Sequence, residues 1–230
     1  MRDDLPLARL WATDRGFPVL LGSLVMLIFV LPAIRYRPES ALLVQILFAL
    51  VLVSGLTATT HGRVTRAAGI AVFAASIALY WIDYFVPRAG LRLATALGRL
   101  AAVVLVTVLV TRHVVRREGS ITIHRIEGAV AVYLLLGLTW AGMYEIIQDV
   151  WPGAFRFSDP VPDTRIDVAT SLAYYSFVTL TTMGYGDITP VHPVARSAAI
   201  LEALVGQLFP AILIARLVSM ELTARGREER

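Results

Sequence analysis

Six apolar runs, each long enough or nearly long enough to cross a bilayer as a helix, constrain the fold of this chain more than any other feature of its sequence. They lie at Phe17–Ile34, Ala41–Ala58, Ala67–Val86, Leu93–Val110, Gly128–Ile147 and Val194–Leu217. A membrane-spanning helix needs about 20 predominantly apolar residues. Only 17% of the residues are charged, whereas a soluble domain carries roughly a quarter. We therefore expect an all-α membrane protein with six transmembrane helices.

The arginines outside these runs predict the orientation of the chain. All its basic residues other than histidine are Arg, and each predicted cytoplasmic segment holds at least as many Arg as the segments on the other side; the richest holds Arg112, Arg116, Arg117 and Arg125. Cytoplasmic loops of membrane proteins carry this excess. We therefore expect a multi-pass protein of the cell (inner) membrane with both termini cytoplasmic. Because no small-residue cleavage site follows the first run, we expect a retained span rather than a signal peptide.

The segment between the fifth and sixth runs does not have the composition of an ordinary loop. Residues 149–165 are rich in Pro, Gly and acids, but residues 167–181 are apolar and aromatic and lead into Gly-Tyr-Gly at 184–186. The apolar part is too short to span a bilayer. Irregular backbone at membrane depth is tolerated only where it lines a watery cavity or is buried in protein. We therefore expect a re-entrant helix that stops midway and leads into a water-lined path.

Residues 182–186 have the composition that a ring of cation-binding carbonyls requires. A bare cation sheds its hydration water only if other oxygens replace that water at similar energy. Successive backbone carbonyls aimed at one axis need alternating backbone conformations, some of them left-handed, which glycine tolerates at Gly184 and Gly186. Thr182 can add its hydroxyl oxygen, and Tyr185 is expected to point away from the axis and brace the ring from behind. Four copies around one axis would form stacked oxygen cages.

The stretch 174–187, YYSFVTLTTMGYGD, resembles the pore helix and selectivity filter of the potassium channel family. The resemblance implies an outer helix, a pore helix, a filter and an inner helix, assembled as a homotetrameric pore among membrane lipids. It also implies the stacked carbonyl sites on which potassium selectivity depends, with K+ as the permeant ion and no other cofactor. The implied K+ ligands are Thr182, Met183, Gly184 and Tyr185, and Gly186 completes the implied filter.

Further residues match positions of the same family. Tyr174 and Tyr175 occupy the aromatic cuff positions around the filter, and Tyr175 is expected to reach Asp187 by a hydrogen bond. Glu145, at the outer end of the fifth run, resembles the acidic residue that ties the outer helix to the outer mouth of the pore. These four residues, together with Val178, are therefore expected to support the filter.

Two residues depart from the family pattern. Met183 stands where Val is usual; only its carbonyl would face the ion, so selectivity should survive, but a flexible thioether could alter the rigidity of the filter. Val178 stands where some relatives carry a Glu that pairs with the filter aspartate. That side-chain pairing is absent from this chain, so any analogy to the inactivation of those relatives is open.

The sixth run has features of a gated inner helix. By resemblance, Gly206 is the hinge glycine, and Pro210 should kink the helix because it removes one backbone hydrogen bond. Helical periodicity places four residues on one face, and the resemblance implies that this face lines the cavity, with an apolar constriction toward its cytoplasmic end. That face carries Gln207, Ala211, Ile214 and Val218. Alternatively, Gly206 and Pro210 are packing features of an ordinary membrane helix, in which both residue types are frequent.

Glu202 is an acid near the middle of the sixth run, where an ionised side chain costs on the order of 3 kcal/mol. It lies away from the predicted cavity face, so we expect it to point at the fifth span or at a pore helix. One interpretation is a structural hydrogen bond to a hydroxyl such as that of Ser176 or Thr179. The other is a protonation switch that sets the stability of gate or filter. The sequence leaves both open.

The resemblance also implies a division of the chain. The expected parts are a four-helix module at 1–117, a linker at 118–127, a pore domain at 128–220 and a short cytoplasmic tail at 221–230. A voltage sensor needs an Arg-rich fourth helix, but only Arg99 lies well inside that span. We expect Arg88, Arg92 and Arg99 to be interfacial anchors that snorkel, and voltage dependence to be weak or absent.

The sequence disfavours four other interpretations. A non-selective cation channel on the same scaffold would be favoured had Tyr185 or Gly186 been replaced. A potassium-uptake transporter would carry four pore repeats in one chain, and we find one. An enzyme is not expected, since the chain has no Cys and its four His residues form no cluster. A nucleic-acid partner is not expected either, because the net charge of +4 is explained by Arg in cytoplasmic loops.

Overall fold

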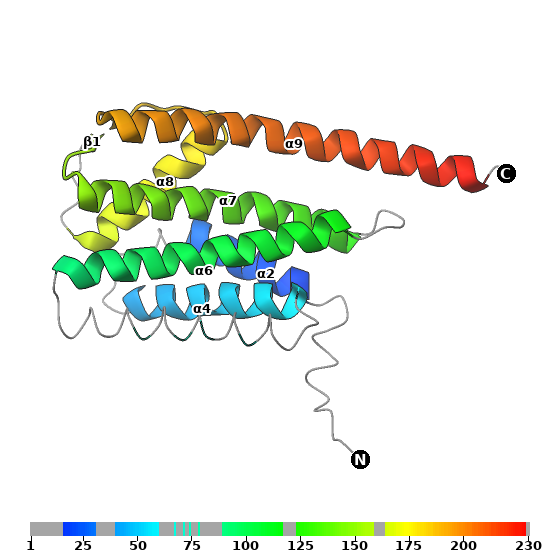
Figure 1. The fold of residues 1–230 in the computed structure, drawn as a ribbon, viewed down its shortest axis with the longest axis horizontal. Coiled ribbons are helices and arrows are strands. Elements are labelled where there is room, and N and C mark those ends of the chain that lie inside the picture. Colours follow the sequence, from blue (N-terminus) through cyan, green and yellow to red (C-terminus); the bar gives the residue numbers. More distant parts are fainter. Residues whose placement is uncertain are drawn as a thin grey trace, which may run out of the picture. The chain divides into compact units, whose positions relative to one another are not determined.

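The computed structural model describes most of the helices that the sequence predicts. It describes residues 16–30, 40–59, 89–116, 123–158 and 164–228, and the single helical positions 67, 71, 74 and 78. The elements in chain order are α2 (Gly16–Val25), the π-helical turn η1 (Met26–Val30), α4 (Ser40–Thr59), α6 (Ala89–Arg116), α7 (Ile123–Val150), β1 (Phe155–Phe157), α8 (Arg165–Leu180), β2 (Ile188–Pro190) and α9 (Pro193–Glu228) (Figure 1).

Three of the described helices are long and apolar enough to cross a membrane, by length and composition. Their apolar windows are Arg92–Val115 in α6, Ile126–Val150 in α7 and Pro193–Arg216 in α9. They correspond to the fourth, fifth and sixth predicted spans. At the first two predicted spans the described helices are apolar but shorter, Gly16–Phe29 and Leu43–Thr59. Most of the third predicted span lies outside the described residues.

Contacts divide the chain into two compact units, each of which takes one half of α6 and one half of α7. The first unit comprises Met1–Ile77 and Ala101–Leu135, and the second comprises Ala78–Leu100 and Leu136–Arg230. Because the division passes through two helices, it does not test the predicted boundary between residues 117 and 128. That boundary stays a prediction.

The first unit packs through small residues at its helix contacts. A methyl group added at Gly16 would lie 2.8 Å from the Cβ of Ala58, which places α2 directly against α4. A methyl group at Gly55 would lie 2.4 Å from a side-chain carbon of Val106, so α4 also lies against the second half of α6. Small residues at helix interfaces allow this backbone approach within a membrane.

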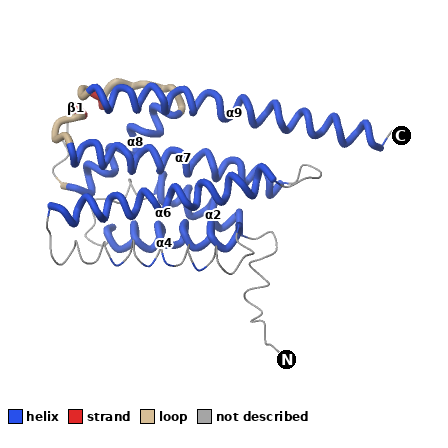
Figure 2. Tube along the Cα trace, viewed as in Figure 1, coloured by secondary structure: helices blue, strands red, loops and turns tan. Residues whose placement is uncertain are grey.

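The second unit places α8 against both the second half of α7 and α9 (Figure 2). Its core is a trio of aromatic rings, Tyr144, Phe155 and Tyr175, whose centroids lie 5.2 to 5.3 Å apart in edge-to-face pairs. Such pairs add about 0.5–1.5 kcal/mol each beyond their buried area. The trio joins α7, β1 and α8, and thus fixes the segment that precedes residue 182.

The second unit also contains two strands that the all-helical prediction missed. Strand β1 pairs antiparallel with β2, with Phe155 opposite Pro190 and Phe157 opposite Ile188. Strand β1 precedes α8 and β2 follows residue 187, so their pairing joins the two ends of the segment that contains α8 and residues 182–187. Helix α9 then continues through Pro210 as one element; the kink expected there stays a prediction.

Candidate ion-conduction site

Helix α8 has a defined beginning and end. At its start the Thr164 side chain accepts from the backbone N–H of Asp167, and the Asp167 carboxylate accepts in return from the backbone N–H of Thr164. This reciprocal arrangement satisfies two N–H groups that the helix itself cannot bond. At its end the N–H of Thr181 donates to the carbonyl of Phe177. The negative end of the helix dipole therefore lies next to residues 182–186, where it favours a cation.

The backbone of residues 182–186 alternates in conformation. The φ angles of Thr182, Gly184 and Gly186 are 59°, 59° and 79°, whereas Met183 and Tyr185 are not in the positive region. The left-handed geometry expected at the two glycines is present. Thr182 was not expected to share it; for a non-glycine residue this region costs about 1–2 kcal/mol. Among the described residues, Thr182 is the one non-glycine residue in this region.

Hydrogen bonds from the amides turn this segment toward the end of α8. The N–H groups of Met183 and Gly184 both donate to the carbonyl of Val178, at 2.9 and 3.4 Å, and that of Thr182 donates to the carbonyl of Thr179 at 2.9 Å. Within the described chain, no N–H donates to the carbonyls of residues 182–185. Val178 was expected to support this segment, and in the structure it contacts the segment through its backbone carbonyl.

The aromatic support differs from the expectation in one contact. The Tyr174 hydroxyl, not that of Tyr175, is hydrogen-bonded to Asp187. The Tyr175 hydroxyl pairs with Thr179 instead, and its ring is buried in the aromatic trio. The prediction for Tyr175 was therefore wrong. Consecutive helical residues point about 100° apart, so only one of the two can face Asp187.

The chain after residue 186 is tied back to the loop that precedes α8. The N–H of Ser158 donates to the carbonyl of Asp187 at 2.9 Å, next to the β1–β2 pair. The N–H of Val191 donates to the carbonyl of Ala154 at 2.9 Å, and the rings of Trp151 and His192 stack at 4.8 Å. The outer end of residues 182–187 is therefore held by backbone contacts on both sides.

Glu145 and Arg99 form an ion pair that the sequence did not predict. The Arg99 guanidinium lies 2.6 Å from the Glu145 carboxylate, and the two side chains are 30% and 20% exposed. The snorkelling of Arg99 to the interface stays a prediction, and the acid on α7 that pairs with its charge was not expected. The described contacts of Glu145 are thus with α6; a tie from Glu145 to the outer mouth of a pore stays a prediction.

Gly206 lies where α9 packs closely against the end of α8. It is buried, and a methyl group added to it would lie 1.9 Å from the carbonyl oxygen of Leu180. Only a residue without a side chain fits here. This observation favours the packing interpretation of Gly206, although it leaves a hinge movement possible in the same helix.

The predicted cavity face of α9 is accessible in the single chain. Its exposed members are Gln207, Ala211 and Ile214, while the side chain of Val218 lies outside the described residues. Pro210 is half-buried beside them. The face is therefore available to line a pore, and the cavity itself stays a prediction.

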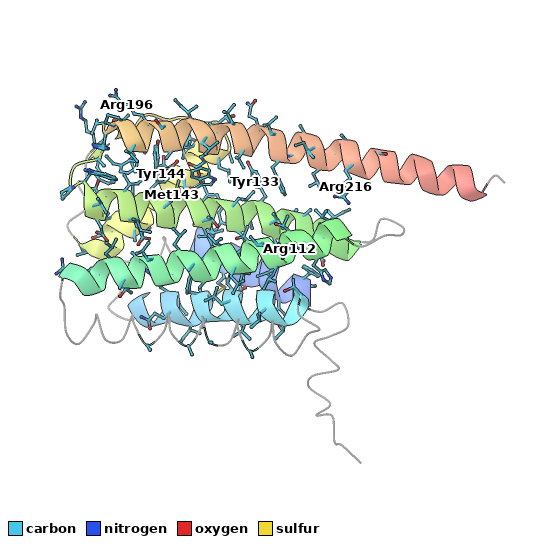
Figure 3. All side chains as sticks on the ribbon, in the orientation of Figure 1. Arg112, Tyr133, Met143, Tyr144, Arg196 and Arg216 are labelled. Atoms are coloured by element: carbon cyan, nitrogen blue, oxygen red, sulfur yellow. The ribbon has the colours of Figure 1, made fainter. Side chains whose placement is uncertain are left out.

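Glu202 is fully buried between α7, α8 and α9. The Tyr144 hydroxyl is 2.5 Å from one carboxyl oxygen and the Ser176 hydroxyl is 2.5 Å from the other. The hydrogen bond to Ser176 is the one that the structural interpretation expected. Tyr144 was not predicted as a partner, although Glu202 was expected to point at the fifth span, on which Tyr144 lies. Figure 3 shows the Tyr144 side chain between α7 and α9.

Comparison with known proteins adds an independent observation on this part of the chain. Residues 132–222 match the protein-family model described as Ion channel. The matched segment contains most of α7, all of α8, residues 182–186 and most of α9. The match supports ion channel activity for this segment, and the matched family is non-enzymatic, as expected for this chain. Together with the apolar helices, it indicates a membrane protein.

Two curated proteins share part of the sequence. Protein LctB of Bacillus caldotenax is 38% identical over 90 residues, which are 37% of this chain and 64% of that protein. Protein LctB of Geobacillus stearothermophilus is 37% identical over 86 residues, which are 37% of this chain and 62% of that protein. The chain thus spans a little under two thirds of the length of these curated relatives.

Proposed function

We propose that this chain is the subunit of a potassium-selective channel, in which four copies surround one conduction axis. The observation that carries the proposal is the alternation of φ along residues 182–186, together with the amides that turn away to Val178 and Thr179. Alternation aims successive carbonyls to the same side of the chain. Four such segments would surround a dehydrated K+ with oxygens at every level.

The uncovered surface of one chain supports assembly with further copies. The side chains of Met183 and Tyr185 are 62% and 64% exposed. Only 17% of the apolar window of α9 is buried, against 39% for those of α6 and α7. The exposed α9 residues include Leu204, Leu208 and Ile212. A channel subunit must leave its inner helix and filter uncovered by its own chain, because the other three copies complete them.

The proposed gate is the inner helix, the filter, or both, and voltage dependence is weak or absent. The one arginine well inside the fourth span is paired with Glu145 at 2.6 Å, so moving it through the field would break an ion pair in addition to the electrical work. We further propose insertion in the cell (inner) membrane with both termini cytoplasmic, on the distribution of Arg in the loops.

Reversal potentials of the purified protein in liposomes test the selectivity. With K+ on one side and Na+ on the other, the reversal potential is expected to lie close to the potassium limit. A reversal potential near zero would instead assign a non-selective cation channel on the same scaffold. Absence of any cation current would contradict the proposal as a whole.

A substitution at Gly184 tests the backbone geometry itself. An added methyl group meets no atom within 4 Å at either Gly184 or Gly22, but Gly184 has a φ of +59° and Gly22 does not have a positive φ. Gly184→Ala is therefore expected to abolish K+ flux through backbone strain of about 1–2 kcal/mol per subunit. Gly22→Ala, the matched control on α2, should leave flux intact. Retained selective flux in Gly184→Ala would count against the proposed ligands.

A further inference from the structure

The buried polar cluster around Glu202 contains more acceptors than protons if its carboxyl group is ionised. The Ser176 hydroxyl lies 2.5 Å from a carboxyl oxygen of Glu202 and 2.8 Å from the carbonyl oxygen of Gly137. A serine hydroxyl has one proton to donate. It therefore cannot donate to both oxygens at once.

A proton on Glu202 resolves this conflict and gives every polar group in the cluster a partner. In that state Tyr144 donates to Oε2 of Glu202, Oε1–H of Glu202 donates to Ser176 Oγ, and Ser176 donates to the Gly137 carbonyl. Each of the three contacts then has one donor and one acceptor at the observed distances of 2.5, 2.5 and 2.8 Å. Buried polar groups are stable when satisfied in this way.

The surroundings of Glu202 hold no cation to stabilise an ionised form. The titratable groups that face it are Tyr144 from α7 and Tyr175 from α8, and both are neutral phenols at neutral pH. Among the described residues, no Arg or His lies within salt-bridge distance of it. Glu145, which follows Tyr144 on α7, is paired with Arg99. A buried carboxylate without a cation is costly, whereas a neutral acid with two hydrogen bonds is not.

We propose that Glu202 is a proton-binding site, and that its bound proton holds the filter-bearing helix α8 against α7 and α9. The link to the filter is short. Ser176 precedes Val178 by two residues, and the carbonyl of Val178 accepts from the amides of Met183 and Gly184. Loss of the proton leaves the one Ser176 proton to two acceptors, removes one hydrogen bond from the cluster, and loosens the end of α8 on which those amides depend.

Infrared spectroscopy of the reconstituted protein tests the bound proton without any transport assay. We expect the carbonyl stretch of a protonated carboxylic acid at neutral pH, its disappearance at high pH, and its loss in Glu202→Gln. Asp149→Asn, at an exposed acid on α7, is the control and should keep the band. Tyr144→Phe should move the band to higher frequency, because the acid's carbonyl oxygen loses its donor. Absence of the band from the unmodified protein at neutral pH would overturn the proposal.

A flux assay over pH tests the link to the filter, and this arm rests on the proposed channel function. We expect K+ flux to fall about tenfold as pH rises through the loss of the infrared band, the effect of one hydrogen bond. Glu202→Gln should keep its flux at all pH values, because the amide N–H donates to Ser176 and the amide oxygen accepts from Tyr144, as the protonated acid does. If the band titrates but Glu202→Gln keeps the pH profile of the unmodified protein, the link to the filter is wrong. If neither protein conducts, the channel assignment fails and the infrared result still decides the proton site.

Discussion

Replacing Gly206 by Ala tests the contact between α9 and the end of α8. The added methyl carbon would lie 1.9 Å from the carbonyl oxygen of Leu180 and 2.8 Å from its carbonyl carbon. Carbon and oxygen atoms in contact lie about 3.3–3.6 Å apart. The obstacle is backbone, so one helix must move by on the order of 1 Å or more, since no side-chain rotation can relieve the overlap. Overpacking of this kind costs about 1–3 kcal/mol.

Thermal unfolding in detergent and K+ flux in liposomes measure the two consequences. We expect the Tm of Gly206→Ala to fall by roughly 5 °C, and flux to be lost because Leu180 directly precedes the filter turn. Gly142→Ala is the control, because its methyl group would lie 3.4 Å from a flexible Leu100 side chain. A Tm unchanged in Gly206→Ala, with only the gating altered, would refute the close-packing account and favour a hinge alone.

Two further contacts of the second unit give predictions. Glu145→Gln should destabilise the protein by about 1–3 kcal/mol, since it leaves the partly buried Arg99 without its counter-charge. Adding Arg99→Gln should restore part of that loss. Equal unfolding midpoints for the single and double variants would contradict the pairing. Thr164→Ala should lower the free energy of unfolding by about 1 kcal/mol through the loss of the cap of α8, whereas Thr164→Ser should lower it little. Both changes are measured from the unfolding midpoint. An alanine variant as stable as the serine variant would contradict the role of the cap.

The helices of the second unit were predictable because their signals are local. The apolar windows of α6, α7 and α9 are long, and the short apolar stretch before Gly-Tyr-Gly was predicted to be a short helix, as α8 is. The left-handed backbone at Gly184 and Gly186 was predictable for the same reason, since glycine marks such positions. Where one residue type is required by local geometry, the sequence reveals the site.

Other features were hidden because they depend on contacts far along the chain. Thr182 has a positive φ although no local rule favours it there; the amides of the following residues, bonded to Val178, impose it. Strands of three residues, β1 and β2, are too short to carry a periodic signal. Arg99 finds its acid on another helix, and nothing in the sequence of α6 identifies that partner.

The choice between neighbouring residues also needed the structure. Tyr174 and Tyr175 are chemically identical and adjacent, so the sequence cannot say which of them reaches Asp187. Glu202 could be assigned a direction from helical periodicity, and Ser176 was named as a partner. That Ser176 has one hydroxyl proton for two acceptors, Gly137 and Glu202, followed only once the distances were known.

A structure of the purified protein in thallium, an electron-dense substitute for K+, tests the central claim most directly. We predict a column of thallium peaks on a fourfold axis, each ringed by carbonyl oxygens of Thr182, Met183, Gly184 or Tyr185. The peaks should weaken when K+ replaces thallium. They should be absent when Na+ replaces thallium at the same concentration. An assembly without a fourfold axis, or a filter segment whose carbonyls face away from any bound thallium, would contradict the account.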